Sequence, residues 1–483
     1  MASFVLKNLA TSEKVCNFVE NLEEKSTQMN KLTLSTALLL GVSLFASAEG
    51  YQVNTLSAKQ EGMGSTGAAL HLGAESQLFN PAAMVMTDKT FEIAGSVSAI
   101  SSHASALSGG VKYKTDNDIS TPLGIATSFR IFDNFYGGLA LYTPYGSAIK
   151  WGDHWPGAVL NQKAKITMFT LQPTLAYKIL PNLSIGAGAM VSWGSVDLDK
   201  GLLTGASMNK LMGALGMPAE SMYNPNSTPA SVNLNGHSKL AVGLNVGALW
   251  DINNQWSVGA MFRTKMTMTV EKGDAKVSYT GAAETMLSPV LDGLNEANFH
   301  ASLPQPYVFT AGVAYKPIPN VTIAFDAQLN GWGTYKQLNI EFDPLSQFNQ
   351  KLEKNYKNAM IYHLGAQWTV TPRLDLRAGI MIDTNPTDKD FYNPETPGQT
   401  RIDPSVGFSF RPIRNFSIDF SFMYVQGLGN DGATGHYDDF VYKMAAQQNP
   451  ALPGMLGLTP QGTFTADYKL HAFIPALGLS YSF

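Results

Sequence analysis

Apolar and polar residues alternate along most of the chain after residue 89, with the period of two that a β-strand imposes. In KLAVGLNVGALW, which ends at Trp250, leucine and valine share one side of the strand, and lysine, glycine and asparagine share the other. Charge in the middle of a strand falls opposite the apolar row, as Asp375 and Arg377 do in LDLRAGIMID and Asp419 does in FSIDFSFMY. This pattern predicts strands with one continuous apolar face and one sparsely charged face.

Two kinds of connection separate these strands and alternate strictly along the chain. Six are short and rich in Asn, Asp and Pro, which suit tight turns because Asn tolerates left-handed backbone and Pro presets φ. With seven long connections they make thirteen, so we predict an all-β fold: a 14-stranded antiparallel transmembrane β-barrel with short turns at one end. The short turns are expected at 133–134, 180–182, 253–254, 317–320, 371–373 and 411–415, and the long loops at 102–120, 143–164, 199–237, 272–305, 342–357, 384–400 and 426–462.

The composition favours a barrel in lipid over a soluble β-sandwich. Only 14% of the 483 residues are charged, against roughly 25% in ordinary globular chains. The mean hydropathy is −0.05, and no run of about 20 apolar residues, the length of a spanning helix, follows residue 48. A sandwich explains the alternation but neither the low charge nor the asymmetry of the connections. The net charge of −4 gives no basic surface for nucleic acid.

The first 48 residues have the arrangement of a secretory signal peptide with an N-terminal extension. A basic Met29-Asn30-Lys31 precedes the apolar LTLSTALLLGVSLF, and Ala46-Ser47-Ala48 supplies a small-residue cleavage site. We therefore expect Met29 to be the true start and the mature chain to begin at Glu49. The single cysteine, Cys16, excludes an intrachain disulfide.

The segment 49–88 lacks strand alternation and is expected to fill the lumen as a hatch, with the barrel occupying 89–483. Its sequence EGYQVNTLSAKQEGMGSTGAAL, followed by Asn80-Pro81-Ala82, resembles the mature N-terminus and hatch of the FadL-type long-chain fatty acid outer-membrane transporters, a family that includes importers of aromatic hydrocarbons. PYG before WGDHWPG, SLPQP, NGWGTYKQLNI, LDLRAGIMIDTNPT and the closing YSF occur in the family's order. The resemblance implies a bacterial outer-membrane protein that takes up hydrophobic compounds.

In that family the hatch plugs the lumen beside a kink in the third strand, where an apolar ligand leaves sideways into the membrane. The resemblance assigns Asn80, Pro81 and Ala82 to the hatch, with Asn80 bonding backbone left unpaired at the kink. Gly137 and Gly138 in NFYGGLALY are the expected position of the kink and lateral gap, because glycine permits an irregular strand.

Two long loops are unusually apolar for a surface, in a roughly helical pattern rich in adaptable methionine. The resemblance implies that these third and fourth outer loops form a groove that first captures the ligand; the alternative is that the two loop helices pack on each other. The expected groove residues are Leu203, Met208, Leu211, Met212, Leu215, Met286, Leu287, Leu291, Leu294 and Phe299.

A carboxylate ligand would need a cation in the lumen, and four basic residues fall on the inward side of their strands. They are Arg130, Arg263, Lys265 and Arg377. Each could instead pair with a wall acid such as Asp375 or Asp326. The expected function is passive uptake of hydrophobic compounds, and the resemblance implies above all long-chain fatty acids. Uptake needs no energy input, because burial of an acyl chain yields about 0.8 kcal/mol per methylene.

Two other functions fit an outer-membrane barrel: a lipid-degrading enzyme, and a nonspecific porin or adhesin. His363 is the one inward mid-strand histidine, but no motif places a serine or an acid beside it. We find no catalytic residues, no phosphate loop, no cluster of metal ligands and no cofactor motif. The expected partners are a hydrophobic small molecule (fatty acid or aromatic hydrocarbon), outer-membrane lipid and, through the terminal Phe483, the barrel assembly machinery. The protein is expected to be a monomer.

Overall fold

The computed structural model describes residues 50–218 and 222–483. The predicted signal peptide at 1–48 and the expected start of the mature chain at Glu49 lie outside the described residues. No helix within the two described ranges has the length and apolarity needed to cross a membrane.

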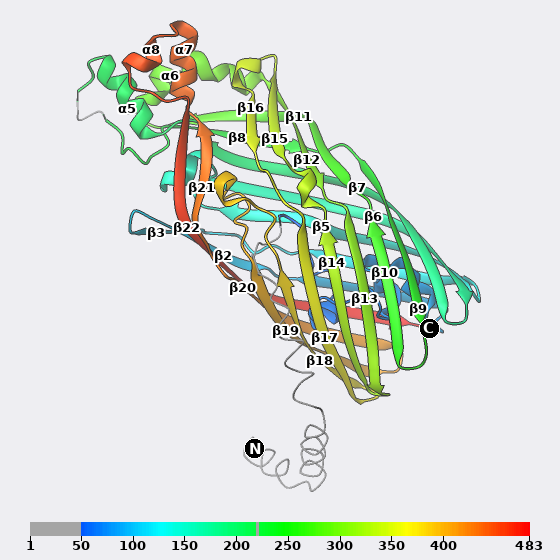
Figure 1. Ribbon diagram of the computed structural model, residues 1–483. Helices are drawn as coiled ribbons and strands as arrows, with labels where there is room; N and C mark the ends of the chain where they lie inside the picture. Colours follow the sequence, from blue (N-terminus) through cyan, green and yellow to red (C-terminus); the bar gives the residue numbers. More distant parts are fainter. Residues whose placement is uncertain (1–49, 219–221) are drawn as a thin grey trace. The chain divides into compact units, whose positions relative to one another are not determined.

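Fourteen antiparallel strands form a closed ring of backbone hydrogen bonds (Figure 1). Successive ring strands pair with each other, and the last pairs with the first through Gly95 and Leu479. This confirms the predicted 14-stranded antiparallel barrel. The ring strands are β1 (Phe91–Ser98), β4 (Leu123–Phe132), β5 (Phe135–Lys150), β6 (Lys163–Leu180), β7 (Leu183–Gly201), β9 (Ala241–Asp251), β10 (Trp256–Arg263), β13 (Val308–Ile318), β14 (Val321–Asn330), β17 (Ala359–Thr371), β18 (Leu374–Asp383), β19 (Arg401–Ile413), β20 (Phe416–Gly427) and β22 (Gln461–Ser482).

The six short turns lie where the sequence places them, at the end of the ring that also holds both of its chain ends. The long connections at the other end are more ordered than expected. Strands within them extend the wall: β2 (Ser101–Ser108), β3 (Val111–Lys114), β8 (Ala230–His237), β11 (Met266–Tyr279), β12 (Asn298–Gln305), β15 (Gln337–Asp343), β16 (Gln350–Glu353) and β21 (Asn430–Asp438). The helices among them are η3 (Pro156–Val159), α5 (Gly205–Ala214), α6 (Ala283–Leu291), η5 (Asp292–Glu296), η6 (Trp332–Thr334), η7 (Ser346–Phe348), η8 (Lys389–Phe391), α7 (Phe440–Gln448) and α8 (Leu452–Met455).

The outer face of the ring is apolar and the inner face is polar, as the alternation predicts. On β9, Leu244 is 52% exposed and Val246 40% exposed, whereas Asn245 between them is fully buried. Aromatic rings flank the short turns on the outside; Trp256 and Tyr315 stack there with ring centres 4.3 Å apart. An apolar outer wall bounded by aromatic rings is the arrangement that lipid favours.

The segment that the sequence assigns to a hatch lies inside the ring (Figure 1). It contains three short helices, α4 (Ala58–Glu61), η1 (Gly73–Leu78) and η2 (Pro81–Val85), and most of it is buried. Because its hydrogen bonds reach strands on all sides of the ring, the segment fills the lumen. These bonds join Ala58 to Ser96 on β1, Gln77 to Thr127 on β4, Ala82 to Ser184 on β7, Gly67 to Asp326 on β14 and Gly64 to Ser405 on β19.

Candidate functional site

Asn80 fixes the hatch to the wall. Its side chain is fully buried; Nδ2 donates to the carbonyl oxygens of Ala68 (2.7 Å) and of Ala248 on β9 (3.0 Å), and Oδ1 accepts the N–H of Ala82 (3.1 Å). Pro81 is the first residue of η2. The N–H at this position of a helix has no acceptor within the helix, so its absence in proline costs no hydrogen bond. The expectation that Asn80 bonds the third strand is wrong, since its wall partner is β9. Asn80 is an anchor.

Three wall glycines make room for this anchor, and the sequence analysis missed them. A Cβ on Gly247 would lie 2.1 Å from Asn80 Oδ1, and one on Gly259 would lie 1.9 Å from the carbonyl oxygen of Ala68. On the neighbouring strand, a Cβ on Gly186 would lie 2.5 Å from the carbonyl carbon of Pro81. Their signal in the sequence is the recurrence of glycine on the inward face of β7, β9 and β10.

Buried polar groups hold the opposite part of the hatch. Lys59 Nζ lies 3.3 Å from Glu75 and 3.7 Å from Asp419 on β20. Burial acts to lower the pKa of Lys59, but the two carboxylates outweigh it, so the pKa lies above the ordinary value. On β14, Asp326 accepts the N–H groups of Gly67 and Ala68 at 2.7 and 2.9 Å.

Two buried titratable side chains, His363 and Glu61, lie where the hatch meets the wall. His363 is buried with Nδ1 2.9 Å from the carbonyl oxygen of Gly64, so its contact is structural. Burial raises the pKa of Glu61 to about 8, although the nearby hydroxyl groups of Ser421 and Ser98 act to lower it. At neutral pH Glu61 is therefore mostly protonated when the hatch is docked.

The expected irregularity at Gly137 and Gly138 is wrong. Both residues pair with β4 on one side and β6 on the other, without a shift in register. Their lack of side chains has another use: the Phe129 ring covers Gly137 on the outer face, where a Cβ would lie 2.7 Å from it. On the inner face, a Cβ on Gly138 would lie 2.5 Å from Met84 Sδ. Gly138 thus lets the hatch approach the wall.

The irregular part of β5 begins after Tyr142. The ladder to β4 ends at Tyr142, and the register with β6 shifts between Tyr142 and Tyr145. Within the described chain, no backbone hydrogen bond joins 144–149 to 117–122, the segment that precedes β4. We call residues 143–149 the break. A proline inside a strand, here Pro144, is the sequence signal that could have located it.

The start of the hatch occupies the edge of β5 that the break exposes. Val53 N donates to the carbonyl oxygen of Pro144 (2.9 Å), and Gly146 N donates to that of Tyr51 (2.8 Å). Residues 51–53, here called the arm, therefore act as a short strand against the break. The Tyr51 ring is also buried against Trp332, with ring centres 5.0 Å apart. Burial raises the pKa of Tyr51 above its ordinary value.

The residues expected to form an outer groove pack together as a core instead. Seven of the ten are buried in one apolar cluster, Leu211 and Met286 are half-buried, and Leu215 alone is strongly exposed, at 63%. Helices α5 and α6 both contribute to this cluster, here called the outer-loop cluster, so both loop helices belong to one packed core. The seven buried members are Leu203, Met208, Met212, Leu287, Leu291, Leu294 and Phe299.

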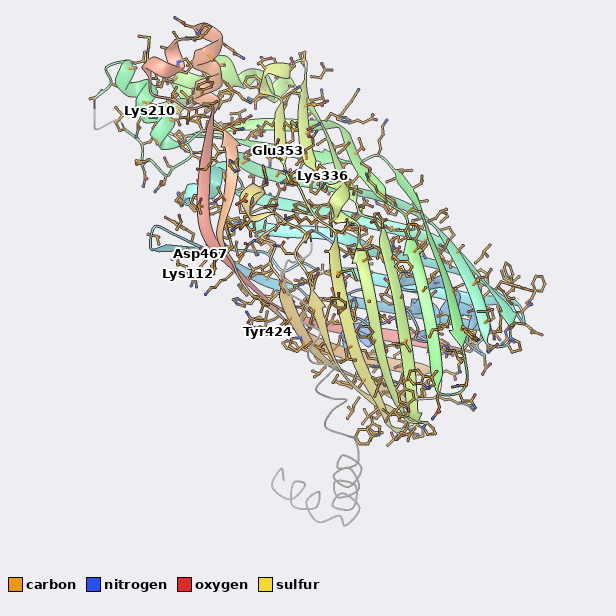
Figure 2. All side chains as sticks on the ribbon, in the orientation of Figure 1. Lys112, Lys210, Lys336, Glu353, Tyr424 and Asp467 are labelled. Carbon is orange, nitrogen blue, oxygen red and sulfur yellow. The ribbon has the colours of Figure 1, made fainter. Side chains whose placement is uncertain are left out.

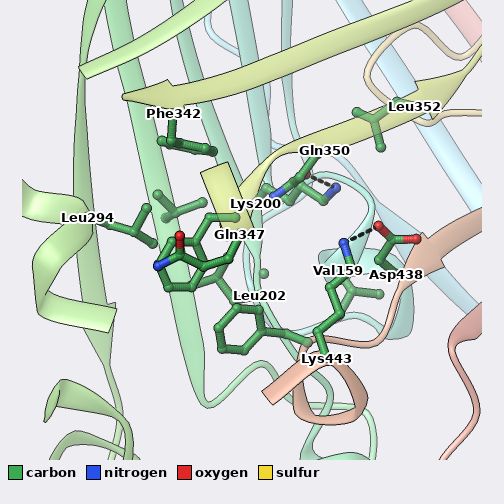
Figure 3. A pocket seen from close by; sticks show the side chains of 14 residues that line it. Val159, Lys200, Leu202, Leu294, Phe342, Gln347, Gln350, Leu352, Asp438 and Lys443 are labelled. Carbon is green, nitrogen blue, oxygen red and sulfur yellow. Dashed lines mark hydrogen bonds and ion pairs between the residues drawn. The ribbon is translucent and has the colours of Figure 1, made fainter. Parts of the chain in front are cut away.

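A small pocket opens beside this cluster (Figure 3). Its volume is about 40 Å³, and apolar side chains that include Leu294 and Phe342 line it together with two lysines. Lys443 pairs with Asp438 at 2.6 Å. Lys200 donates to Gln350 Oε1 at 2.9 Å, and no carboxylate of the described residues lies within ion-pair distance of it. The pocket thus has an apolar body and one cation without an acidic partner.

Two of the four basic residues expected to meet a carboxylate are already paired. Arg377 is buried 3.5 Å from Asp375 and donates to Ser409 Oγ at 2.6 Å. Arg130 lies at the end with the short turns, where it donates to the carbonyl oxygen of Asp88 (2.8 Å) and lies 3.7 Å from Asp133.

The other two differ sharply from each other. The inward placement of Lys265 is wrong, because its side chain is exposed. Thr264 and Lys265 separate β10 from β11. The inward residues are odd-numbered on β10 and even-numbered at the start of β11. Arg263 is 5% exposed inside the ring. It donates to the carbonyl oxygen of Leu78 at 2.9 Å, and its guanidinium carbon lies 5.8 Å from the ring centre of Tyr142.

Arg263 lacks an acidic partner. Among the residues that the structure describes, no carboxylate lies within ion-pair distance of it, and its Nε has no hydrogen-bond partner. It lines a cavity of about 40 Å³ between the hatch and the wall, together with Leu56, Phe79, Met261 and Val308. Polar side chains, among them Gln60, Gln328 and His363, complete the lining, so this is a buried cation facing a small space of mixed character.

Comparisons with known proteins agree with this architecture. The chain is 22% identical to outer membrane protein P1 of Haemophilus influenzae, over 94% of this chain and 100% of that protein. It is 23% identical to a 47 kDa outer membrane protein of Pasteurella multocida, over 84% and 94% of the two chains. The solved structure of a Pseudomonas aeruginosa FadL homologue matches the fold with a TM-score of 0.71 at 18% identity, over 90% and 100%. The Pseudomonas putida toluene transporter TodX matches with a TM-score of 0.64 at 15% identity, over 90% and 99%.

The model of one protein family, described as outer membrane protein transport protein (OMPP1/FadL/TodX), matches residues 39–483. Members of this family are outer-membrane channels for hydrophobic compounds and not enzymes, so the alternative of a lipid-degrading enzyme is wrong. The chain therefore belongs to the OMPP1/FadL/TodX family of bacterial outer-membrane transport proteins.

Proposed function

We propose that this transporter takes up long-chain fatty acids by passive diffusion and that Arg263 receives their carboxylate. The observation that carries the proposal is the buried guanidinium without an acidic partner. A buried charge is costly unless it is paired. A carboxylate ligand would complete the site, because a guanidinium binds a carboxylate through two parallel hydrogen bonds. The apolar members of the lining, Leu56, Phe79 and Met261 among them, would contact the acyl chain that follows.

Aromatic hydrocarbons are the competing substrate class, since toluene transporters share the fold. A neutral ring would leave the Arg263 charge uncompensated after the hatch moves. An aromatic ligand could stack on the Tyr142 ring and gain a cation–π contact with the guanidinium. That contact leaves the charge without a counterion, whereas a carboxylate neutralises it. The unpaired cation thus favours an acid.

The pocket beside the outer-loop cluster is the proposed first binding site, with Lys200 as a second cation for the carboxylate. Its 40 Å³ is far smaller than the 150 Å³ or so that benzene needs. Entry therefore requires the loops to separate. Leu215, the strongly exposed member of the ten expected groove residues, is suited to make the first apolar contact.

Release is proposed to occur sideways through the break in β5, at residues 143–149, and not at Gly137 and Gly138. The wall there lacks its backbone ladder to the segment before β4, and the arm covers the exposed edge. Displacement of the arm would open a path from the lumen into the lipid. Each methylene that enters the membrane contributes about 0.8 kcal/mol, so the path needs no energy source.

Uptake assays in a strain that lacks its own transporter test the proposal. Arg263→Gln should lower oleate uptake by about tenfold or more, the size of one charge-assisted hydrogen bond, and leave toluene uptake unchanged. Arg263→Lys should retain most oleate uptake. The matched control is Arg130→Gln, which removes an arginine that already has an acidic neighbour. Unchanged oleate uptake in Arg263→Gln would exclude the carboxylate site, and equal loss of both substrates would make Arg263 a structural residue.

A further inference from the structure

Five basic side chains gather on the outer face of the wall, away from the lumen. They lie on β2, β3 and β22, and all five are exposed. Together they line a pocket of about 680 Å³ that also includes Gln426 and Leu428 from the end of β20. The five are His103, Lys112, Lys114, Lys469 and His471. Nothing in the transport route uses them, because the lumen lies on the other side of these strands.

The strand register explains why they meet. Ser105 on β2 pairs with Lys114 on one side and with Lys469 on the other. One step along the sheet, His103 pairs with His471, and their rings stack with centres 5.1 Å apart. Antiparallel partners point to the same face of a sheet, so two lysines and two histidines share one outer surface within two rungs.

The lysines of this pocket carry charge without a counterion. No carboxylate in the described ranges lies within ion-pair distance of Lys112, Lys114 or Lys469. Asp467 is the acid that the strand register brings nearest to Lys112, because Leu107 on β2 pairs with Asp467 on one side and with Lys112 on the other. Its carboxylate already accepts the N–H of Gly432 at 2.8 Å. Figure 2 shows Lys112 and Asp467 at the same edge of the barrel, with Tyr424 further along the wall.

The pocket lies directly above the apolar band. On β22 the outward residues Phe473, Leu477, Leu479 and Tyr481 are exposed, and they span nine residues, or about 20 Å of height for a tilted strand. The Phe473 ring forms the upper end of this row and contacts His471, with ring centres 5.9 Å apart. The basic pocket is therefore at headgroup level, on the side of the long connections.

We propose that this pocket binds the phosphate groups of a phosphorylated glycolipid in the outer leaflet of the outer membrane. Unpaired lysines are point charges that suit phosphate, and basic clusters next to a membrane surface bind anionic headgroups. A lipid fits better than free phosphate, because its acyl chains would lie on the exposed apolar row immediately below the cations. The bound headgroup would hold β2 and β3 against β22 at the membrane surface.

Native mass spectrometry of the detergent-solubilised barrel with a bisphosphorylated diglucosamine glycolipid (lipid A) tests the proposal. The wild type should form a one-to-one adduct. The triple variant Lys112→Gln, Lys114→Gln, Lys469→Gln should bind about a hundredfold more weakly, since each lysine near a membrane surface contributes about fivefold. The matched control is Lys272→Gln, Lys276→Gln, Lys351→Gln, which removes the same charge from exposed lysines of the same outer half. It should bind as the wild type does.

Two further arms separate the lipid from other anions. Dephosphorylated diglucosamine glycolipid should not bind, and millimolar inorganic phosphate should not displace the bisphosphorylated form. Equal binding by the triple variant and the wild type would overturn the proposal, as would equal losses in both triple variants. Displacement by inorganic phosphate would show a free-anion site and would overturn the assignment to a lipid.

Discussion

The hatch meets the wall in two regions that differ in how they are held. At the Asn80 anchor, a fully buried amide makes three hydrogen bonds, and wall glycines on three neighbouring strands admit the backbone closely. At the arm, two backbone hydrogen bonds join residues 51–53 to the edge of a strand whose regular pairing has ended. The anchor is built into an intact wall, whereas the arm covers a break in it.

This difference separates a fixed part of the hatch from a releasable one. Opening the anchor would strand a buried amide and several backbone groups without partners, each costing about 1 to 3 kcal/mol. Opening the arm would free two backbone hydrogen bonds of about 1 kcal/mol each and would expose an edge to a passing ligand. We therefore expect transport to move the arm and to leave the anchor in place.

The largest effect is expected from a covalent lock on the arm. Gln52 and Tyr145 are directly opposed, and the hydrogen bonds that flank them mark the closely spaced kind of pair that a disulfide can bridge. Gln52→Cys with Tyr145→Cys should abolish uptake of oleate when oxidised and restore it when reduced. Uptake of labelled oleate before and after dithiothreitol measures this.

A second cysteine pair controls for the chemistry of the lock. Asn339 and Lys351 oppose each other on β15 and β16, outside the proposed route. Asn339→Cys with Lys351→Cys should transport equally when oxidised or reduced. Full uptake through the oxidised Gln52 and Tyr145 pair would place the exit elsewhere than the break.

One side chain added at the Asn80 anchor should destabilise the docked hatch more than the loss of any single contact of the arm. Gly247→Val would place a methine carbon 2.1 Å from where Asn80 Oδ1 now lies. Overpacking and a broken hydrogen bond together cost about 2 to 4 kcal/mol. Protection of residues 58–86 from hydrogen exchange should fall by about a hundredfold, and conductance in planar bilayers should rise. Ala248→Val, one residue away on the outer face, is the control and should change neither.

The ring was predictable from the sequence because alternation is a property of each strand by itself. Val242 and Leu244 face out and Asn245 faces in whatever lies beside them. Strands β8, β11, β12 and β15 in the long connections were not predictable, because their inner faces pack on the outer-loop cluster and are as apolar as a buried helix. Lys265 shows a further limit: the two residues between β10 and β11 change the parity, and no local pattern records that change.

The site was predictable only in part, for a related reason. Asn80 and Pro81 stand out locally, but their partner strand depends on which wall positions are glycine across β7, β9 and β10. Glycine alone marked Gly137 and Gly138 as irregular, yet Phe129 and Met84 fill the space on either face and the pairing is intact. Sequence shows where a side chain is absent, and only packing shows what uses the space.

Acidity should alter the docking of the hatch through Glu61, on the wall side opposite the Asn80 anchor. The pKa of Glu61 is about 8 in the docked hatch, above the ordinary value of 4.5, so docking takes up a proton. The stabilisation is complete below about pH 4.5 and is lost as the pH rises to about 8. Between pH 6 and pH 7 the undocked population should rise by about tenfold. Hydrogen exchange of residues 58–66 measures this, with Glu61→Gln as the reference at each pH; a parallel rise in that variant would rule out Glu61.

The smallest effect is expected from a change at Thr143, where the break adjoins the start of β4. The Thr143 hydroxyl donates to the carbonyl oxygen of Leu123 (3.3 Å) and accepts its N–H (3.0 Å), replacing the ladder where β4 begins. Thr143→Val removes both bonds, worth about 1 kcal/mol, and should widen the break and raise oleate uptake by up to about fivefold. Thr127→Val, in the intact ladder between the same two strands, loses a similar hydroxyl bond to Leu139 and should not change uptake. If the two variants behave alike, the break has no special part in release, and the contrast between anchor and arm concerns stability alone.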